Sequence, residues 1–192
     1  MMLRLAMLLA AAGLAGGSPT TMNYRLQAEP GPVLSEASPA VSVRSVSVPG
    51  YLAGTAIGRL SSAYQFASYP NDVWAEPLAD MLQATMVEDL AQRLPAATVL
   101  PDGGAIGAPT GTVVEMNVLR FDPDPDGQID LSVQISVRRG NNTRNWQTTS
   151  FTRQAPPQSN DAVGTAATMS ALWSQAADQV AAMLANTNSP GG

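Results

Sequence analysis

The sequence predicts an α+β domain in which a mixed, mostly antiparallel sheet has two long helices packed on one face. Residues 128–138 alternate apolar and polar side chains without a break, which is typical of a half-buried antiparallel strand. Two other stretches, residues 72–94 and 161–185, repeat apolar side chains at helical spacing. Groups of strand-like segments precede each helix, and this order indicates one two-layered unit.

The first half of the chain contains short strand-like regions before its helix. Residues 24–26 form a candidate strand. Residues 41–48 alternate valine with polar side chains, but the alternation slips by one residue at Arg44. This slip predicts a β-bulge at Arg44 and Ser45, which would restore one buried face. Residues 56–68 are typical of a short hairpin.

The first helix is predicted to begin after residue 72. Asn71 or Asp72 can cap its N-terminus, and Pro77 is tolerated in the first turn, where a missing N–H group costs no hydrogen bond. Its buried face is given by apolar residues that recur every four positions: Leu78, Leu82, Met86, Leu90 and Leu94. The opposite face is expected to contact water through Asp80, Gln83 and Glu88.

The second half of the chain contains the clearest hairpin, with arms at residues 113–121 and 128–138. A further strand is predicted at residues 145–153, and the second long helix at residues 161–185. The buried face of this helix is predicted to contain Val163, Ala166, Met169, Trp173, Val180 and Leu184. Core packing is the expected role of Trp173 and also of Trp74, which is expected at the start of the first helix.

Residues 1–17 are typical of a secretory, lipoprotein-like signal peptide. A short basic start is followed by an apolar run that is too short to span a membrane, because a spanning helix needs about 20 apolar residues. The alternative is a core helix, but no capping residue precedes it. In bacterial lipoprotein signals the tripeptide Leu-Ala-Gly precedes a modified cysteine, whereas here Gly17 follows it. The nucleophile for lipid attachment is therefore missing at this position.

The remaining chain is predicted to form one domain with irregular ends. Residues 18–40 are rich in Gly, Pro, Ser and Thr and are expected to be an extended segment. Residues 41–185 are expected to form a single α+β domain, and residues 186–192 a disordered tail.

The composition excludes several classes of function. The chain has no Cys and no His, and all ten basic residues are Arg. It therefore lacks the side chains for disulfides, zinc–thiolate sites, Ser-His-Asp triads and Schiff bases. The net charge of −5 disfavours nucleic-acid binding, which depends on clustered basic residues. We expect no catalytic residue, no cofactor and no resident metal.

Two alternatives rest on acidic side chains. Residues 122–127 place Asp at alternate positions before Gly, as at the start of an EF-hand calcium loop, so a secreted calcium- or ligand-binding module using Asp122–Asp126 is one alternative. The twelfth position of that loop is Val133 instead of a bidentate Glu, which favours a plain hairpin turn. An enzyme could instead use a carboxylate pair drawn from Asp80, Glu88, Asp89 and Glu115, although their spacing indicates no particular site.

Several short motifs together resemble a known family. Residues 49–52 read Pro-Gly-Tyr-Leu, residues 73–78 read Val-Trp-Ala-Glu-Pro-Leu, and residues 118–121 read Val-Leu-Arg-Phe. With the lipoprotein-like signal, this set resembles the PqiC-type ABC-transport auxiliary lipoproteins, the paraquat-inducible protein C family. The resemblance covers residues 23–185.

The resemblance implies a non-catalytic accessory component of an MCE-type ABC transport system that moves lipids between bacterial membranes. It implies a location in the periplasm at the outer membrane and an MCE-domain protein with its ABC permease and ATPase as partners. A homo-oligomer and direct contact with lipid are further alternatives. Gly17 stands where the family has its anchor cysteine. The residues that we expect to dock on a partner are Pro49, Tyr51, Leu52, Trp74, Glu76 and Pro77.

Overall fold

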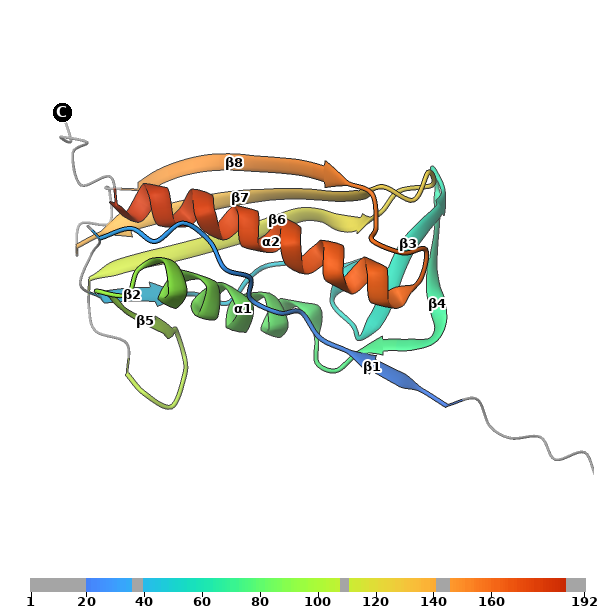
Figure 1. The fold of residues 1–192 in the computed structure, drawn as a ribbon, viewed down its shortest axis with the longest axis horizontal. Helices are drawn as coiled ribbons and strands as arrows, with labels where there is room; N and C mark the ends of the chain where they lie inside the picture. Colours follow the sequence, from blue (N-terminus) through green and yellow to red (C-terminus); the bar gives the residue numbers. More distant parts are fainter. Residues whose placement is uncertain (1–19, 36–39, 108–110, 141–145, 186–192) are drawn as a thin grey trace, which may run out of the picture.

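The computed structural model describes residues 20–35, 40–107, 111–140 and 146–185. The predicted signal peptide and the predicted tail lie outside these residues. The described chain forms two sheets and two helices, and both helices cover the same face of the larger sheet (Figure 1). The predicted α+β class with a mixed, mostly antiparallel sheet is confirmed.

The larger sheet has five strands in the order β5-β2-β6-β7-β8. Their bounds are Thr98–Pro101 for β5, Ala40–Val43 for β2, Thr112–Pro123 for β6, Ile129–Arg139 for β7 and Trp146–Ala155 for β8. The strands β5, β2 and β6 are parallel, whereas β6, β7 and β8 form an antiparallel meander. The strict alternation predicted for residues 128–138 is confirmed, because every predicted inward residue of β7 is buried.

The slip at Arg44 separates β2 from the chain that follows it. Arg44 and Ser45 are exposed, and Val46 returns to the buried side. Beyond the slip the chain still follows β6, because the N–H group of Ser47 donates to the carbonyl of Met116 at 3.0 Å. The predicted irregularity is therefore present, but regular pairing of β2 ends at Val43, so the predicted strand is shorter than residues 41–48.

A second, three-stranded sheet stands at one end of the larger one, in the order β1-β4-β3 (Figure 1). It consists of β1 (Met22–Tyr24), β3 (Ala56–Ser62) and β4 (Gln65–Trp74). The predicted hairpin over residues 56–68 is confirmed, with longer arms. The strand β1 overlaps the predicted strand at residues 24–26 only at Tyr24.

The helix α1 (Leu78–Arg93) begins later than predicted. Pairing with β1 extends β4 as far as Trp74, so Asn71 and Asp72 lie in a strand, and the predicted cap at these residues is wrong. Pro77 is the N-cap residue, with an extended backbone and no side-chain cap. The predicted apolar stripe is confirmed, since all five of its residues are fully buried.

The helix α2 (Ala162–Ala185) is capped by Asp161, whose carboxylate accepts the N–H group of Gly164 at 2.8 Å. Its predicted buried face is confirmed at five of six positions. Val163 is 57% exposed, so the prediction for this residue is wrong. It lies in the first turn, where the flanking residues Ala162 and Gly164 face inward instead.

The core lies between the helices and the larger sheet. Trp173 of α2 is completely buried and stacks on Phe121 of β6, with ring centroids 6.1 Å apart. Its indole Nε1 donates to the carbonyl of Leu82 in α1 at 3.0 Å. Because one residue thus contacts the sheet and both helices, it fixes the arrangement of the layers.

Candidate functional site

The first candidate surface is built around Tyr51, in the short 3₁₀ turn η1 (Gly50–Leu52). Tyr51 is 46% exposed, while the neighbouring Leu52 is buried and anchors the turn. The Tyr51 ring meets the ring of Phe66 on β4 edge to face, with centroids 5.2 Å apart. An exposed aromatic pair thus stands on a fixed backbone.

Three charged residues of β6 and β7 support this aromatic pair. The hydroxyl of Tyr51 donates to Oδ1 of the buried Asp122 at 2.9 Å. The Nε atom of Arg120 lies 3.4 Å from the same oxygen. Its Nη1 atom lies 2.5 Å from Oδ2 of Asp130. We call Tyr51, Phe66, Arg120, Asp122 and Asp130 the Tyr51 surface.

Burial shifts the pKa of two groups in this cluster, Asp122 and Tyr51. It raises the pKa of Asp122 above its ordinary value, although the bonds from Tyr51 and Arg120 act in the opposite direction. Burial and the nearby Asp122 charge also raise the pKa of Tyr51, so its hydroxyl remains a donor at neutral pH. The second oxygen of Asp122, Oδ2, is buried and has no hydrogen-bond partner in the described chain.

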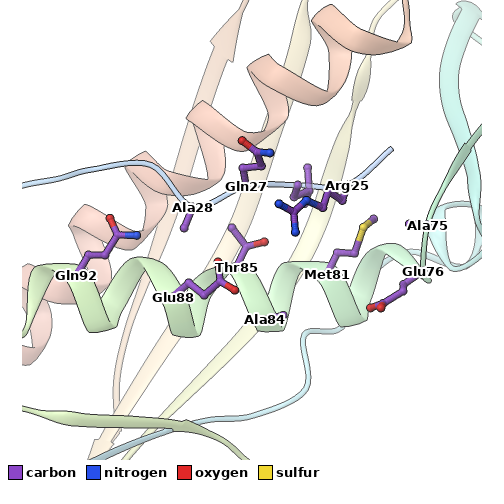
Figure 2. A pocket seen from close by; sticks show the side chains of 11 residues that line it. Arg25, Gln27, Ala28, Ala75, Glu76, Met81, Ala84, Thr85, Glu88 and Gln92 are labelled. Carbon is purple, nitrogen blue, oxygen red and sulfur yellow. The ribbon is translucent and has the colours of Figure 1, made fainter. Parts of the chain in front are cut away.

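The second candidate surface is a groove of about 410 Å³ beside α1, which we call the α1 groove. One wall is the extended segment 25–28, the other is α1, and Ala75 and Glu76 close one end (Figure 2). Arg25, Glu76 and Glu88 are its charged residues. None of the three forms an ion pair within the part of the chain that the structure describes.

The structure places four of the six predicted docking residues at or beside these two surfaces. Tyr51 belongs to the first, with Pro49 half-buried beside it, and Glu76 lines the second next to the exposed Pro77. Leu52 and Trp74 are buried and cannot themselves touch a partner. Trp74 lies at the end of β4 instead of on a helix, where its N–H group donates to the carbonyl of Thr55 at 2.7 Å. Its predicted role in the core is confirmed.

A buried polar cluster, absent from the sequence predictions, holds the wall of the α1 groove in place. We call it the Arg93 cluster; its members are Glu29, Asp89, Arg93, Ser174 and Asp178. The guanidinium of Arg93 donates to Asp89 Oδ1 at 3.0 Å, to Ser174 Oγ at 2.9 Å and to Asp178 Oδ1 at 2.6 Å. It also donates to the backbone carbonyl of Glu29 at 3.1 Å. The cluster therefore ties the N-terminal segment to both helices.

Asp89 illustrates why this cluster could not be predicted from the sequence. An Asp and an Arg four residues apart on a helix usually form an exposed pair, but here both side chains are fully buried. Burial raises the pKa of Asp89, against the effects of the Ser174 hydroxyl, the Glu29 N–H group and Arg93. Asp89 is thus a structural carboxylate and does not line the α1 groove.

The calcium-like motif forms a hairpin turn between β6 and β7. Asp122 is turned toward Tyr51, and Asp124 accepts the N–H groups of Asp126 at 2.9 Å and Gln128 at 2.8 Å. Gly127 has a φ of 84°, which favours glycine at this turn position. Within the described residues, no three Asp or Glu side chains are grouped so that they could hold a metal ion.

No helix in the described ranges is both long enough and apolar enough to span a membrane.

Solved structures with the same fold are available for comparison. A crystal structure of an uncharacterized protein superposes with a TM-score of 0.69 at 22% identity, covering 86% of this chain and 99% of that one. A protein from Xanthomonas campestris gives a TM-score of 0.66 at 18% identity, covering 86% and 95%. At these identities the similarity establishes the fold alone.

Sequence comparison identifies the family. The chain is 36% identical over 77 residues to the intermembrane transport lipoprotein PqiC of Escherichia coli K12, and equally to that of Shigella flexneri. These alignments span 39% of this chain and 41% of the relatives, so less than half of each relative is matched. The family model for the ABC-type transport auxiliary lipoprotein component matches residues 24–181, which include both candidate surfaces. This protein therefore belongs to the family of ABC-type transport auxiliary lipoprotein components.

Proposed function

We propose that this protein is a non-catalytic accessory component of an MCE-type ABC transport system that moves lipids between bacterial membranes. The family match over residues 24–181 carries this proposal. The name of the PqiC relatives, intermembrane transport lipoprotein, supports a role between the two membranes of the envelope. We place the protein in the periplasm at the outer membrane, with an MCE-domain protein and its permease and ATPase as partners.

The location of the acidic groups supports a non-catalytic role. A carboxylate-based enzyme requires acids of shifted pKa that converge in a cavity. Asp89 and Asp122 are the carboxylates whose pKa burial raises, and neither lines the α1 groove. Each is instead bonded to an arginine inside the fold.

The Tyr51 surface is the docking surface in this proposal. Tyrosine and arginine are enriched among the residues that contribute most to protein interfaces. The hydrogen bond to Asp122 and the contact with Phe66 already hold Tyr51 in place, so little side-chain entropy would be lost on binding. Leu52 contributes by anchoring the turn that carries Tyr51.

Affinity purification from envelope extracts in mild detergent tests the proposal. The tagged wild-type protein should recover an MCE-domain protein together with a permease or ATPase, and Tyr51→Ala should recover much less. Tyr64→Ala is the matched control, because Tyr64 is fully exposed at the tip of the β3–β4 hairpin and should be dispensable.

The experiment tests the transport role and the assignment of the docking surface independently. If the wild-type protein recovers no MCE-domain protein and no transporter subunit, the transport role is wrong. If folded Tyr51→Ala recovers the partners as well as Tyr64→Ala does, the role stands and the assignment of the docking surface is wrong. Mass measurement of the protein isolated from the envelope tests whether the chain carries a lipid despite Gly17.

A further inference from the structure

The edge of β1 that pairs with β4 continues beyond the point where its partner strand ends. The last backbone hydrogen bond across this edge runs from the N–H group of Ala75 to the carbonyl of Tyr24, at 2.7 Å. From Pro77 the chain turns away into α1. Residues 25–28 run on along the α1 groove, opposite α1 (Figure 2).

The backbone of this segment has the alternating pattern of a strand. The N–H group of Gln27 donates to Ser170 Oγ and that of Glu29 to Asp89 Oδ1, each at 3.1 Å. In an extended chain, successive N–H groups point to opposite sides. We therefore expect those of Leu26 and Ala28 to point to the side where Tyr24 meets Ala75. Among the described residues neither has a hydrogen-bond partner.

The charges around the groove favour a basic ligand. Two carboxylates, Glu76 and Glu88, line it against one guanidinium, that of Arg25. Figure 2 shows Glu88 extending from α1 toward the segment near Ala28, while Arg25 lies nearer the other end, above Met81. A positive side chain entering at the Ala28 end would therefore meet Glu88, which has no ion-pair partner in the described chain.

We propose that the α1 groove binds a short extended peptide segment of a partner protein, which adds as a strand to Leu26 and Ala28 and places a Lys or Arg against Glu88. Such strand addition derives its affinity from main-chain hydrogen bonds and its specificity from flanking side chains. The groove is a different surface from the Tyr51 surface, so the inference does not depend on the transport role.

Nuclear magnetic resonance of the ¹⁵N-labelled protein tests this binding mode. The probe is a blocked hexapeptide of alternating valine and threonine with one valine replaced by lysine. Millimolar peptide should shift the amide signals of Leu26 and Ala28 and slow their hydrogen exchange. The same peptide with N-methylated backbone amides should not bind, because it cannot form the strand pair. If the N-methylated peptide binds equally well, or if neither amide responds to the unmodified peptide, the inference is wrong.

Two substitutions distinguish backbone pairing from charge attraction. Ala28→Pro removes an N–H group that has no partner within the described fold, so the melting temperature should hold while peptide binding is lost. Gln27→Pro removes the donor to Ser170 and should lower the melting temperature instead. If Ala28→Pro fails to fold, the N-methylated peptide still decides the question.

The charge at Glu88 is tested separately. Glu88→Gln should weaken binding about two- to fivefold, the effect of one exposed ion pair. Asp126→Asn in the distant β6–β7 turn is the control and should leave binding unchanged. Equal binding by Glu88→Gln and Asp126→Asn would overturn the assignment of Glu88. Vesicles containing phosphatidylethanolamine provide the remaining comparison: if they shift Leu26 and Ala28 while the peptide does not, the groove is a headgroup site and the peptide inference is wrong.

Discussion

Arg93 on α1 and Asp178 on α2 are joined by a contact of 2.6 Å between Nε and Oδ1. The Arg93 side chain is only 1% exposed, although it is charged. The guanidinium also donates to the carbonyl of Glu29, and the backbone carbonyl of Arg93 accepts the N–H group of Leu34 at 2.7 Å. The N-terminal segment, α1 and α2 are therefore coupled at one residue.

Removing the guanidinium should strongly destabilise the protein. Arg93→Met keeps much of the side-chain volume but leaves Asp89 buried without its cation. Breaking a buried pair in this way costs about 3–5 kcal/mol of unfolding free energy. Urea denaturation measures the change, and Arg25→Met is the control, since Arg25 has no ion-pair partner in the described chain and should change stability by less than about 0.5 kcal/mol. Similar losses for both variants would contradict the structural role of Arg93.

Gly31 should not tolerate a side chain. A Cβ atom built at this residue collides with the Arg93 guanidinium, which cannot easily move because its hydrogen bonds fix it. We expect Gly31→Ala to lower the unfolding free energy by about 1–3 kcal/mol, the usual cost of overpacking. Gly54→Ala is the matched control, because a Cβ atom there meets no atom within 4 Å. A melting temperature for Gly31→Ala equal to that of the control would show that the segment can shift away from Arg93.

The Tyr51 hydroxyl should stabilise the fold as well as position the ring. Tyr51→Phe keeps the contact with Phe66 but leaves Oδ1 of Asp122 without its hydroxyl donor. The expected cost at neutral pH is about 1–3 kcal/mol, because a buried acceptor loses a partner. Tyr64→Phe, at a fully exposed site, should have no measurable effect in the same denaturation experiment. If Tyr51→Phe left the unfolding free energy unchanged, Arg120 alone would satisfy this oxygen.

Asp122 should make stability depend on pH in a defined direction. Its folded-state pKa is raised above the ordinary 3.8, so the folded protein holds this proton more tightly than the unfolded chain does. The stabilisation is fully present below the unfolded-state pKa and is lost as the pH rises through the folded-state pKa. In Asp122→Asn the side chain at residue 122 cannot titrate, so this contribution to the pH dependence of stability is absent.

Denaturation of both proteins between about pH 3 and pH 8 isolates the effect, because Asp89 is common to both. The unfolding free energy of the wild type minus that of Asp122→Asn should fall as the pH rises. A difference that grows with pH would show that the Tyr51 and Arg120 bonds outweigh burial and lower the pKa of Asp122.

Local patterns in the sequence predict the regular elements well. The alternation of β7 and the four-residue spacing in α1 record which face is buried, because each period belongs to one backbone geometry. The start of α1 could not be predicted in this way. Asn71 and Asp72 are good capping residues, but pairing of the end of β4 with β1 keeps them in a strand, and no local signal reports a pairing partner.

The candidate docking residues also show which features the sequence predicts and which depend on tertiary packing. The motifs around Tyr51 and Glu76 are visible in the sequence, and both residues are exposed. Leu52 and Trp74 carry the same motifs yet are buried, because η1 and the end of β4 pack against the core. A motif shows which residues occur together, whereas burial depends on how distant segments meet.

Composition alone excludes chemistry based on Cys, His or Lys, since a missing side chain cannot be supplied by folding. The order of residues likewise predicts the amphipathic faces of the main helices and strands. The Arg93 cluster and the α1 groove arise only in three dimensions. Each brings together the N-terminal segment and a helix that lie about 50 or more residues apart, as the contact between Glu29 and Arg93 with a separation of 64 residues shows. Such contacts depend on the packing of the whole chain, and a pattern within one segment does not contain them.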